Sequence, residues 1–253
     1  MGSIDGHHAL ITGGGTGIGA AIAESLAAEG AALSLVGRRP APLETLAAKL
    51  PKAVAIPTDI TDEDQISAMV ATAHQAFGPV SILIANAGTA SSAPLASTDL
   101  HAWRAMIDVN LTGAFLATRV VLPDMMQARV GRIIFVASTA GLKGYSYVAP
   151  YCAAKHGVVG MARALAIEVA QNGITVNAVC PGFTETPMLD ASIKTIVETT
   201  GRMEHEAKRA LIKNNPQGRF VQPEEVAATV LWLCSTGAKA INGQAIAVAG
   251  GEI

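Results

Sequence analysis

Two side chains that can transfer protons stand four residues apart in the stretch Tyr151-Cys152-Ala153-Ala154-Lys155. On a helix this spacing places both on one face, one turn apart. A free tyrosine titrates near ~10, and a fixed positive charge beside it favours the phenolate and lowers that pKa. The pair is therefore suited to proton transfer to or from a substrate oxygen. The same spacing by itself also fits a partly buried ring beside a solvated amine.

A glycine-rich segment, Thr12-Gly13-Gly14-Gly15-Thr16-Gly17-Ile18-Gly19, follows a short apolar run at 9–11 and precedes a helical pattern. Glycines at such a strand-to-helix turn let a pyrophosphate approach the backbone N–H groups at the helix N-terminus. The spacing of Gly13, Gly17 and Gly19 is G-x-x-x-G-x-G rather than the commoner G-x-G-x-x-G. Its place at the first turn of the chain favours a dinucleotide site over a turn that merely needs positive φ.

Two arginines, Arg38 and Arg39, stand where the second predicted strand ends. In a dinucleotide-binding fold a carboxylate at this position bonds the ribose 2′-hydroxyl, whereas an arginine accommodates a 2′-phosphate. The stretch Gly37-Arg38-Arg39 contains no carboxylate. We therefore predict NADP(H) as the preferred cofactor, with NAD(H) as the alternative. The alternative without a function is that both cations are solvated at a helix start, where the helix dipole does not stabilise them.

Strand-like apolar runs alternate with helical patterns along the whole chain. The predicted strands are 9–11, 32–36, 53–56, 80–85, 132–137, 174–179 and 245–248, and the longest predicted helices are 103–127 and 150–172. This alternation is typical of an α/β, doubly wound parallel sheet of the Rossmann type, here with about seven strands and with helices on both faces. No linker or repeat divides the chain, so we predict one domain over 1–253. The exception is 186–216, a helical insertion that is well placed to cover a substrate site.

The composition limits the classes of function. Only 15% of the 253 residues are charged and the net charge is −2, which argues against binding to nucleic acid or to an acidic membrane. No signal peptide or apolar run of about 18 residues is evident, so we expect a cytoplasmic protein without a membrane span. The three cysteines have no metal-ligand spacing, and we expect no metal site. The low charge leaves apolar surface to cover, so we expect a homo-oligomer.

These motifs, in this order and at these predicted strand ends, resemble the short-chain dehydrogenase/reductase family over essentially the whole chain. The resemblance comprises the loop at 12–19, Asp59, Asn86-Ala87-Gly88, Asn110, Ser138, Tyr151 with Lys155, and Pro181-Gly182. The wide glycine spacing and the short chain disfavour the extended branch of that superfamily, with its epimerases and dehydratases. The segments 177–183 and 218–224 resemble 3-oxoacyl-thioester and polyketide ketoreductases, although other branches share much of both.

The resemblance implies a hydride-transfer site. Tyr151 would protonate a carbonyl oxygen or deprotonate an alcohol, and Ser138 would hydrogen-bond the same oxygen. Lys155 would hold the nicotinamide ribose and lower the pKa of Tyr151, and Asn110 would support a water that relays protons to Lys155. The purely structural alternatives are that Ser138 caps the end of a strand and that Asn110 is a buried amide bonded to neighbouring backbone. The resemblance also implies a homotetramer, with 103–127 and 150–172 in one interface.

The expected cofactor contacts follow from the glycine loop, the two arginines and the family pattern. They are Gly13, Thr16, Gly17, Ile18, Gly19, Arg38, Arg39, Asp59, Ile60, Asn86, Gly88, Tyr151, Lys155, Pro181, Gly182, Thr184 and Thr186. The residues expected to face the substrate are Ala140, Leu142, Tyr145, Val148 and Phe183. Because this set is apolar apart from one phenol, a hydrophobic ketone or a 3-oxoacyl thioester fits better than a sugar. A thioester would bring coenzyme A or an acyl carrier protein as partner.

The predicted function is an NAD(P)-dependent oxidoreductase that transfers a hydride between the cofactor and a carbonyl or secondary alcohol. An NAD(H)-dependent alcohol or 3-hydroxyacyl dehydrogenase of the same family is the alternative. A non-catalytic sensor of nicotinamide redox state would usually lack the tyrosine or the lysine. A methyltransferase on a similar fold would not need Ser138, Tyr151 and Lys155 together.

Overall fold

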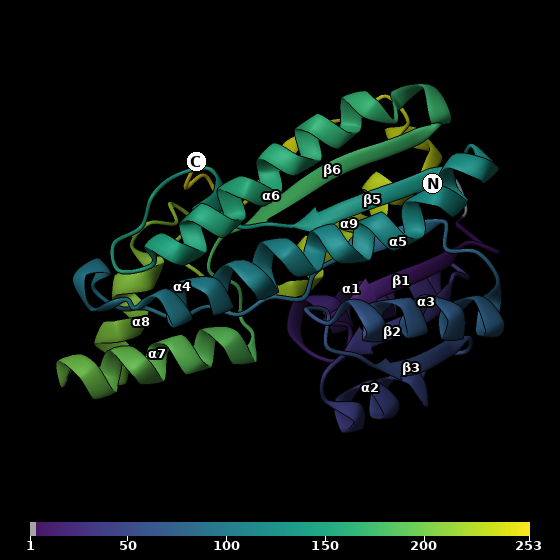
Figure 1. Cartoon of the computed structure of the whole chain (residues 1–253). Coiled ribbons are helices and arrows are strands. Elements are labelled where there is room, and N and C mark those ends of the chain that lie inside the picture. Colours follow the sequence, from purple (N-terminus) through teal and green to yellow (C-terminus); the bar gives the residue numbers. More distant parts are fainter. Residues whose placement is uncertain (1–3) are drawn as a thin grey trace.

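The computed structural model describes residues 4–253, and within them seven strands form one sheet (Figure 1). The strand order is β3-β2-β1-β4-β5-β6-β7, and all neighbouring pairs are parallel. The strands are β1 His8–Thr12, β2 Ala32–Gly37, β3 Ala53–Pro57, β4 Ile82–Ala85, β5 Gly131–Val136, β6 Ile174–Pro181 and β7 Ala245–Val248. The predicted parallel α/β sheet is confirmed.

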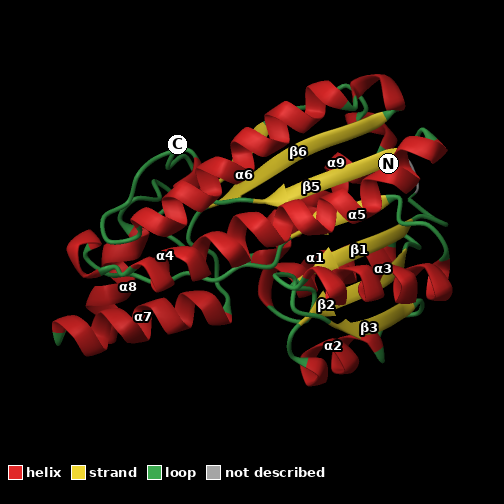
Figure 2. Cartoon of the chain, viewed as in Figure 1, coloured by secondary structure: helices red, strands yellow, loops and turns green. Residues whose placement is uncertain are grey.

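Nine α-helices accompany the sheet in the described part of the chain, and most of them cover its two faces (Figure 2). They are α1 Gly17–Ala28, α2 Pro40–Ala47, α3 Glu63–Phe77, α4 Leu100–Ile107, α5 Gly113–Ala128, α6 Ala149–Glu168, α7 Pro187–Thr200, α8 Glu204–Ile212 and α9 Pro223–Cys234. One apolar core joins the sheet to α3, α5 and α6, and a second joins it to α1, α2 and α9.

The strands are apolar on both sides because both faces of the sheet are buried. In β1, Leu10 belongs to the core under α5 and α6, whereas Ala9 and Ile11 belong to the core under α1 and α9. Successive side chains of a strand point to opposite faces, so a strand between two helical layers shows a continuous apolar run. This is why the strands were recognisable in the sequence without an alternating pattern.

The carboxyl ends of all seven strands meet at one edge of the sheet because the strands are parallel. The order reverses between β1 and β4, and ligands of such sheets bind in the crevice outside the strand ends at that point. The glycine loop, the loop after β4 and the loop after β5 all start at this edge. Helices α7 and α8 lie beyond the same edge, at the left of Figure 1.

The helix predicted at 103–127 contains a π-helical turn. Helix α4 passes into a π-helical turn, Asp108–Thr112, before α5 begins. Asn110 lies in this turn, and its side-chain amide donates to the carbonyls of Met106 at 3.0 Å and Thr89 at 2.9 Å. Single π-helical turns of this kind are frequent at functional sites. The predicted helix is confirmed as a helical run over 100–128, and only the π-helical turn inside it was not predicted, because apolar periodicity does not register one extra residue in a turn.

The run from α4 through α5, Leu100–Ala128, is the one described helical stretch that is long and apolar enough to cross a membrane. Its inner side chains, among them Leu116, Ala117 and Val121, are buried in the core on the sheet. A core helix passes the same test of length and composition, and this run is packed as a core helix.

The insertion predicted at 186–216 consists of α7 and α8. Thr186 caps α7, because its Oγ1 accepts from the backbone N–H of Leu189 at 3.4 Å. The two helices share a small apolar cluster of their own, formed by Leu189, Ile193, Ala207 and Phe220. They are therefore joined mainly to each other and stand apart from the two large cores.

Candidate active site

The structure brings Ser138, Tyr151 and Lys155 together at the carboxyl edge of the sheet. Ser138 follows β5, and Tyr151 and Lys155 lie in the first turns of α6. Lys155 Nζ is 5.7 Å from the centroid of the Tyr151 ring, so the two share one helix face as their spacing predicts. Ser138 hydrogen-bonds the Tyr151 hydroxyl. The same serine caps the short turn that follows it, because its Oγ accepts from the Ala140 N–H at 3.0 Å.

Burial changes the proton affinities of both side chains on α6. It raises the pKa of Tyr151 to about 12, and the hydrogen bond from Ser138 opposes that shift. It lowers the pKa of Lys155 to about 8. Both directions follow from desolvation, which disfavours a phenolate and an ammonium alike. The pKa of Tyr151 therefore moves in the direction opposite to the one predicted from its charged neighbour, and burial is the largest cause.

Lys155 and Asn110 meet around Gly88, in the loop after β4. Lys155 Nζ is buried and donates to the Val136 carbonyl at 2.9 Å. Asn110 Oδ1 accepts from the Thr89 N–H at 3.2 Å, so the buried amide does bond neighbouring backbone. A Cβ at Gly88 would lie 2.7 Å from Asn110 Oδ1 and 3.6 Å from Lys155 Nζ. Only glycine leaves both polar atoms this close to the loop.

The glycine loop has the shape that a pyrophosphate needs. Gly13 and Gly17 have φ of +65° and +55°, which favours glycine, and a Cβ at Gly19 would collide with the carbonyl oxygen of Gly13. Asn86 holds the loop, since its Nδ2 donates to the carbonyls of Thr12 at 2.9 Å and Gly13 at 3.2 Å. The start of α1 has no side-chain cap and no acidic residue in its first turn. The loop and helix end therefore fit an anionic group.

The end of β2 carries positive charge only. Arg38 and Arg39 are exposed, and Arg39 Nη2 lies 3.5 Å from Thr16 Oγ1 at the glycine loop. The nearby Asp59 carboxylate is turned to its own loop, where it accepts from the Thr61 N–H at 2.9 Å and from the Thr61 hydroxyl at 2.7 Å. These bonds, aided by Arg38, lower the pKa of Asp59. The arrangement suits a 2′-phosphate. Next to Asp59, Ile60 is buried against Gly113.

The loop after β6 runs from Pro181 to the start of α7 and comes back to the glycine loop. A Cβ at Gly17 would lie 3.1 Å from Thr186 Cγ2, so Thr186 lines the opposite side of that turn. Thr184 is buried, and its hydroxyl donates to the Gly182 carbonyl at 2.9 Å, within its own loop. Ile18, on the first turn of α1, packs partly against the core under α1.

The residues predicted to face the substrate lie in the loop after β5 and in the loop after β6. Ala140 is buried, Val148 is the residue before α6, and Leu142 is packed partly on the core under α6. The Tyr145 ring meets Phe183 edge to face, with the ring centroids 6.0 Å apart. The two loops are thus joined by an aromatic pair.

One residue near this pair, Glu252, was not among the predicted site residues. Its carboxylate Oε1 accepts from the Tyr145 hydroxyl at 2.5 Å and pairs with Lys143 Nζ at 3.0 Å. The available signal was a carboxylate directly after Gly250-Gly251, just beyond the last predicted strand. Because that strand is parallel to the others, its carboxyl end also reaches the site edge.

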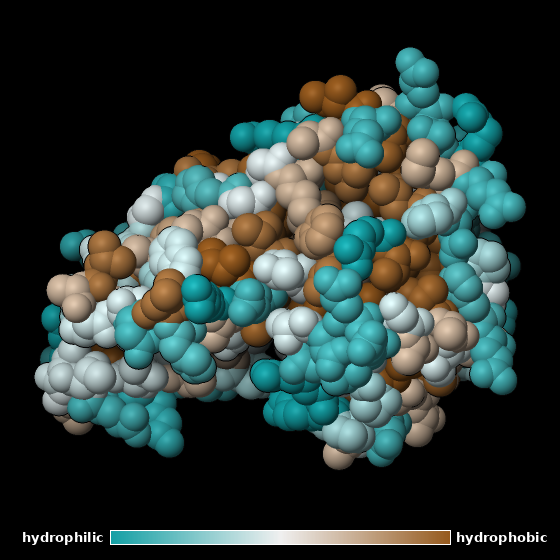
Figure 3. Space-filling model, viewed as in Figure 1, coloured by the Kyte–Doolittle hydropathy of each residue, from teal (hydrophilic) through white to brown (hydrophobic). Residues whose placement is uncertain are grey.

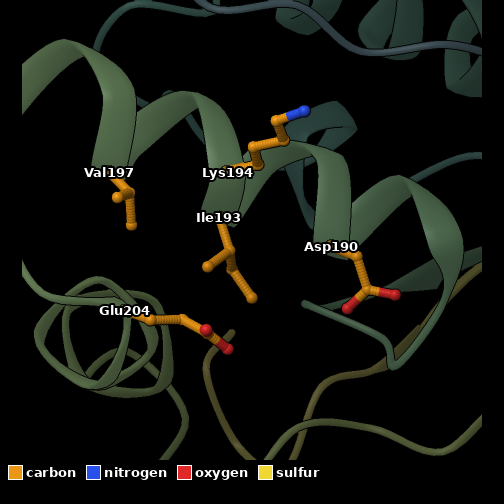
Figure 4. Close-up of a pocket in the computed structure, with 5 residues that line it drawn as sticks. All are labelled: Asp190, Ile193, Lys194, Val197 and Glu204. Atoms are coloured by element: carbon orange, nitrogen blue, oxygen red, sulfur yellow. The ribbon is translucent and has the colours of Figure 1, made fainter.

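A separate hollow lies between α7 and α8 (Figure 4). Ile193 and Val197 of α7 point toward α8, Glu204 extends from the start of α8, and Lys194 points away. None of the predicted substrate-lining residues lies in this hollow. Among the described residues, no group of three or more His, Cys, Asp or Glu side chains could hold a metal ion.

Comparisons with known proteins agree with this geometry. The family model for short chain dehydrogenases matches residues 7–196. A protein of Streptomyces coelicolor that carries the name ketoacyl reductase is 39% identical over 257 residues, covering 99% of this chain and 98% of its own length. A D-beta-hydroxybutyrate dehydrogenase of Cupriavidus necator is 37% identical over 245 residues, covering 95% of each chain.

Among solved structures, a variant of actinorhodin polyketide ketoreductase, crystallised with NADPH, has a TM-score of 0.94 at 38% identity. It covers 100% of this chain and 99% of its own. The family match spans the glycine loop, Ser138, Tyr151 and Lys155. The chain therefore belongs to the short-chain dehydrogenase family, whose members interconvert alcohols and carbonyl compounds with a nicotinamide cofactor.

Proposed function

We propose that this enzyme uses NADPH to reduce a hydrophobic ketone or a 3-oxoacyl thioester, with Tyr151 as the proton donor. The observation that carries the proposal is the grouping of Ser138, Tyr151 and Lys155 at the sheet edge that also holds the glycine loop. A carbonyl that enters between them meets a phenol and a hydroxyl, which are the donors that its developing negative charge requires.

Bound NADPH supplies the hydride to the carbonyl carbon. Tyr151 donates its proton to the carbonyl oxygen, and Ser138 donates a hydrogen bond to the same atom. Since the pKa of Tyr151 is about 12, the phenol is protonated at neutral pH, which favours the direction of reduction. Lys155, with a pKa of about 8, still carries most of its charge there and can return a proton to the phenolate. Asn110 lies beside this path, across Gly88.

The preference for NADPH is supported by the exposed Arg38 and Arg39 and by the absence of a carboxylate in 37–39, the end of β2. The remaining predicted contacts line the same edge: Gly13, Gly17 and Gly19 for the pyrophosphate, Asp59 and Ile60 for the adenine, and Pro181, Gly182 and Thr186 for the nicotinamide end. The related ketoreductase structure contains NADPH, which agrees with this preference.

The substrate class is supported by the apolar set on the two loops and by the names of the relatives. Those names refer to a ketoacyl group and to a beta-hydroxybutyrate, and the latter carries its oxygen on the third carbon of the acyl chain. A coenzyme A or acyl carrier thioester is therefore the form of ketone that we favour. The helices of the insertion would cover it.

The proposal includes a cytoplasmic homotetramer. Apolar side chains interrupt the surface that α4, α5 and α6 present in Figure 3. Leu100, Trp103, Phe115 and Ile167 are exposed on these helices. Because exposed apolar patches on such helices mark association surfaces, this face supports the interface predicted at 103–127 and 150–172. Size-exclusion chromatography with light scattering measures the assembly; a monomer would contradict it.

The test is a screen in which NADPH or NADH oxidation is followed with ketones, diketones and 3-oxoacyl thioesters. Tyr151→Phe should lower kcat roughly a thousandfold, because it removes a general acid, while NADPH binding is retained. The matched control is Tyr147→Phe, an exposed tyrosine of the neighbouring loop, which should leave kcat within about twofold. Turnover that survives in Tyr151→Phe would refute the assignment.

A further inference from the structure

The carboxylate of Glu252 is buried beside Tyr145, one of the residues predicted to face the substrate, and the exposed fraction of the Glu252 side chain is 1%. It accepts from the Tyr145 hydroxyl, which also lies 2.7 Å from Thr139 Oγ1. A phenol has one proton and a carboxylate only accepts, so Tyr145 donates to Glu252 and accepts from the Thr139 hydroxyl. Both hydrogen-bonding directions of the phenol are therefore used within the protein.

Lys143 supplies the charge that balances this carboxylate. Its ammonium lies 3.0 Å from Glu252 Oε1, 3.5 Å from the Glu252 carbonyl and 5.1 Å from the Tyr145 ring centroid. The lysine side chain is 36% exposed, whereas the Glu252 side chain is buried, so solvent reaches the pair mainly at the lysine. Together, Lys143 and Glu252 carry no net charge, so the surface that they form with Tyr145 is neutral.

The backbone after β7 is built to bring Glu252 to this place. Gly250 and Gly251 have φ of +63° and +92°, conformations that favour glycine. A Cβ at Gly250 would collide with the Asn215 side chain, which lies just after α8. The segment thus passes directly against the end of the insertion. It then places the Glu252 carboxylate 3.2 Å from the position of a Cβ on Gly182.

Glu252 consequently connects three segments around the predicted substrate space: the loop after β5, the loop after β6 and the segment after β7. Thr139, which it orients through Tyr145, directly follows Ser138 in the chain. The Tyr145 ring also meets Phe183 edge to face, so an aromatic pair belongs to the same surface. The Tyr145 hydroxyl and the Glu252 charge are both paired within the protein. The surface that remains for a substrate is therefore neutral and apolar.

We propose that Glu252 is a specificity-determining residue that neutralises Lys143 and occupies the Tyr145 hydroxyl, so that the site selects uncharged ketones and thioesters over keto acids. This inference rests on the proposed function and states which substrates that function takes. A free carboxylate on the substrate would find no unpaired cation here, because Lys143 is held by Glu252, and it would lose its hydration against an apolar surface. This uncompensated desolvation is the element that rejects the keto acid.

The test compares acetoacetate with ethyl acetoacetate, which carry the same ketone with and without a negative charge. The wild-type enzyme should prefer the ester. Glu252→Gln keeps an oxygen that accepts from Tyr145 but removes the charge, so Lys143 becomes free to attract the acid. The ratio of kcat/KM for acid over ester should rise on the order of fivefold, as expected for a half-exposed ion pair. The KM for NADPH should change less than about twofold.

Two further variants separate charge from structure. The double variant Lys143→Gln with Glu252→Gln should return the ratio to its wild-type value, because neither charge remains. The exposed carboxylate Glu224, at the start of α9, is the matched control, and Glu224→Gln should leave the ratio unchanged. An unchanged ratio in Glu252→Gln, or a raised ratio that persists in the double variant, would overturn the inference.

The dissociation constants of acetoacetate and ethyl acetoacetate are also compared, by calorimetry with the NADP⁺ complex of each variant. If the wild type binds both probes but reduces neither, nor any ketone of the screen, the proposed function fails. The binding ratio in Glu252→Gln then still decides whether Glu252 selects for charge.

Discussion

The two halves of the site are built by different means. On the proposed cofactor side, the loop at 12–19 is shaped by backbone: two glycines with positive φ, one glycine without room for a Cβ, and an asparagine bonded to two carbonyls. On the proposed substrate side, the surface is formed by side chains from three separate segments, among them Tyr145, Phe183 and Glu252. A loop that is shaped by its backbone tolerates few substitutions. Side chains that form a surface can be replaced one at a time.

The difference has a chemical reason. The pyrophosphate is the same in NADPH and NADH and is bound by backbone N–H groups, which every residue except proline possesses and glycine exposes best. A ketone is recognised by its own shape and charge, and these require particular side chains. We expect substitutions on the cofactor side to have large and uniform effects, and substitutions on the substrate side to have small effects that differ between substrates.

Among substitutions that compare the two halves, Gly19→Ala should have the largest effect on binding. Its Cβ would collide with the Gly13 carbonyl and lie 2.6 Å from Asn86 Nδ2, so the loop must shift. A strain of about 3 kcal/mol corresponds to roughly a hundredfold weaker NADPH binding. Fluorescence titration measures the affinity, and a melting curve verifies folding. The control is Gly144→Ala on the substrate loop, where a Cβ meets nothing within 4 Å. Equal effects of the two variants would erase the proposed contrast.

Arg38→Ala should have the next largest effect, and only with one cofactor. Loss of a charge-assisted contact to the 2′-phosphate should raise the KM for NADPH by about tenfold or more. The KM for NADH should change by less than about twofold, since NADH has no phosphate there. Steady-state kinetics with both cofactors provides the internal control. A parallel rise for both would mean that Arg38 supports the fold and does not read the phosphate.

Where the halves meet, on α6, activity should depend on pH through Lys155. Its folded pKa is lowered to about 8, so the ammonium is present below that pH and is lost above it. Tyr151, with a pKa of about 12, remains protonated throughout this range. The rate of reduction should therefore fall about tenfold between roughly pH 7 and pH 9. A stopped-flow pH profile measures this, and a rate that is flat or rises over that interval would exclude Lys155 as the group that returns the proton.

The smallest effect should come from Phe183→Ala on the substrate wall. It removes the edge-to-face partner of Tyr145 but leaves Glu252 and Leu142 in place. Aromatic pairs contribute about 0.5–1.5 kcal/mol, so the KM for a bulky ketone should rise by about fivefold. The KM for a small ketone and that for NADPH should barely change. A similar loss for all ketones would show that Phe183 supports the loop rather than the substrate.

Local patterns of the sequence were sufficient for much of this protein. Strand and helix alternation identified the parallel sheet, because residues buried on both faces are apolar whatever their neighbours. The glycine loop and the spacing of Tyr151 and Lys155 predicted contacts within one turn of chain. Such features depend on residues that are close in sequence, and they were located correctly.

Only the tertiary structure decided the features that depend on distant segments. The π-helical turn holds Asn110 where its side-chain amide donates to the Thr89 carbonyl of another segment. The raised pKa of Tyr151 follows from its burial, which the whole fold produces. Glu252 reaches Tyr145 across 107 residues of chain. No local sequence pattern predicts the contact between Glu252 and Tyr145, because this contact forms only when the parallel sheet brings every strand end to the same edge.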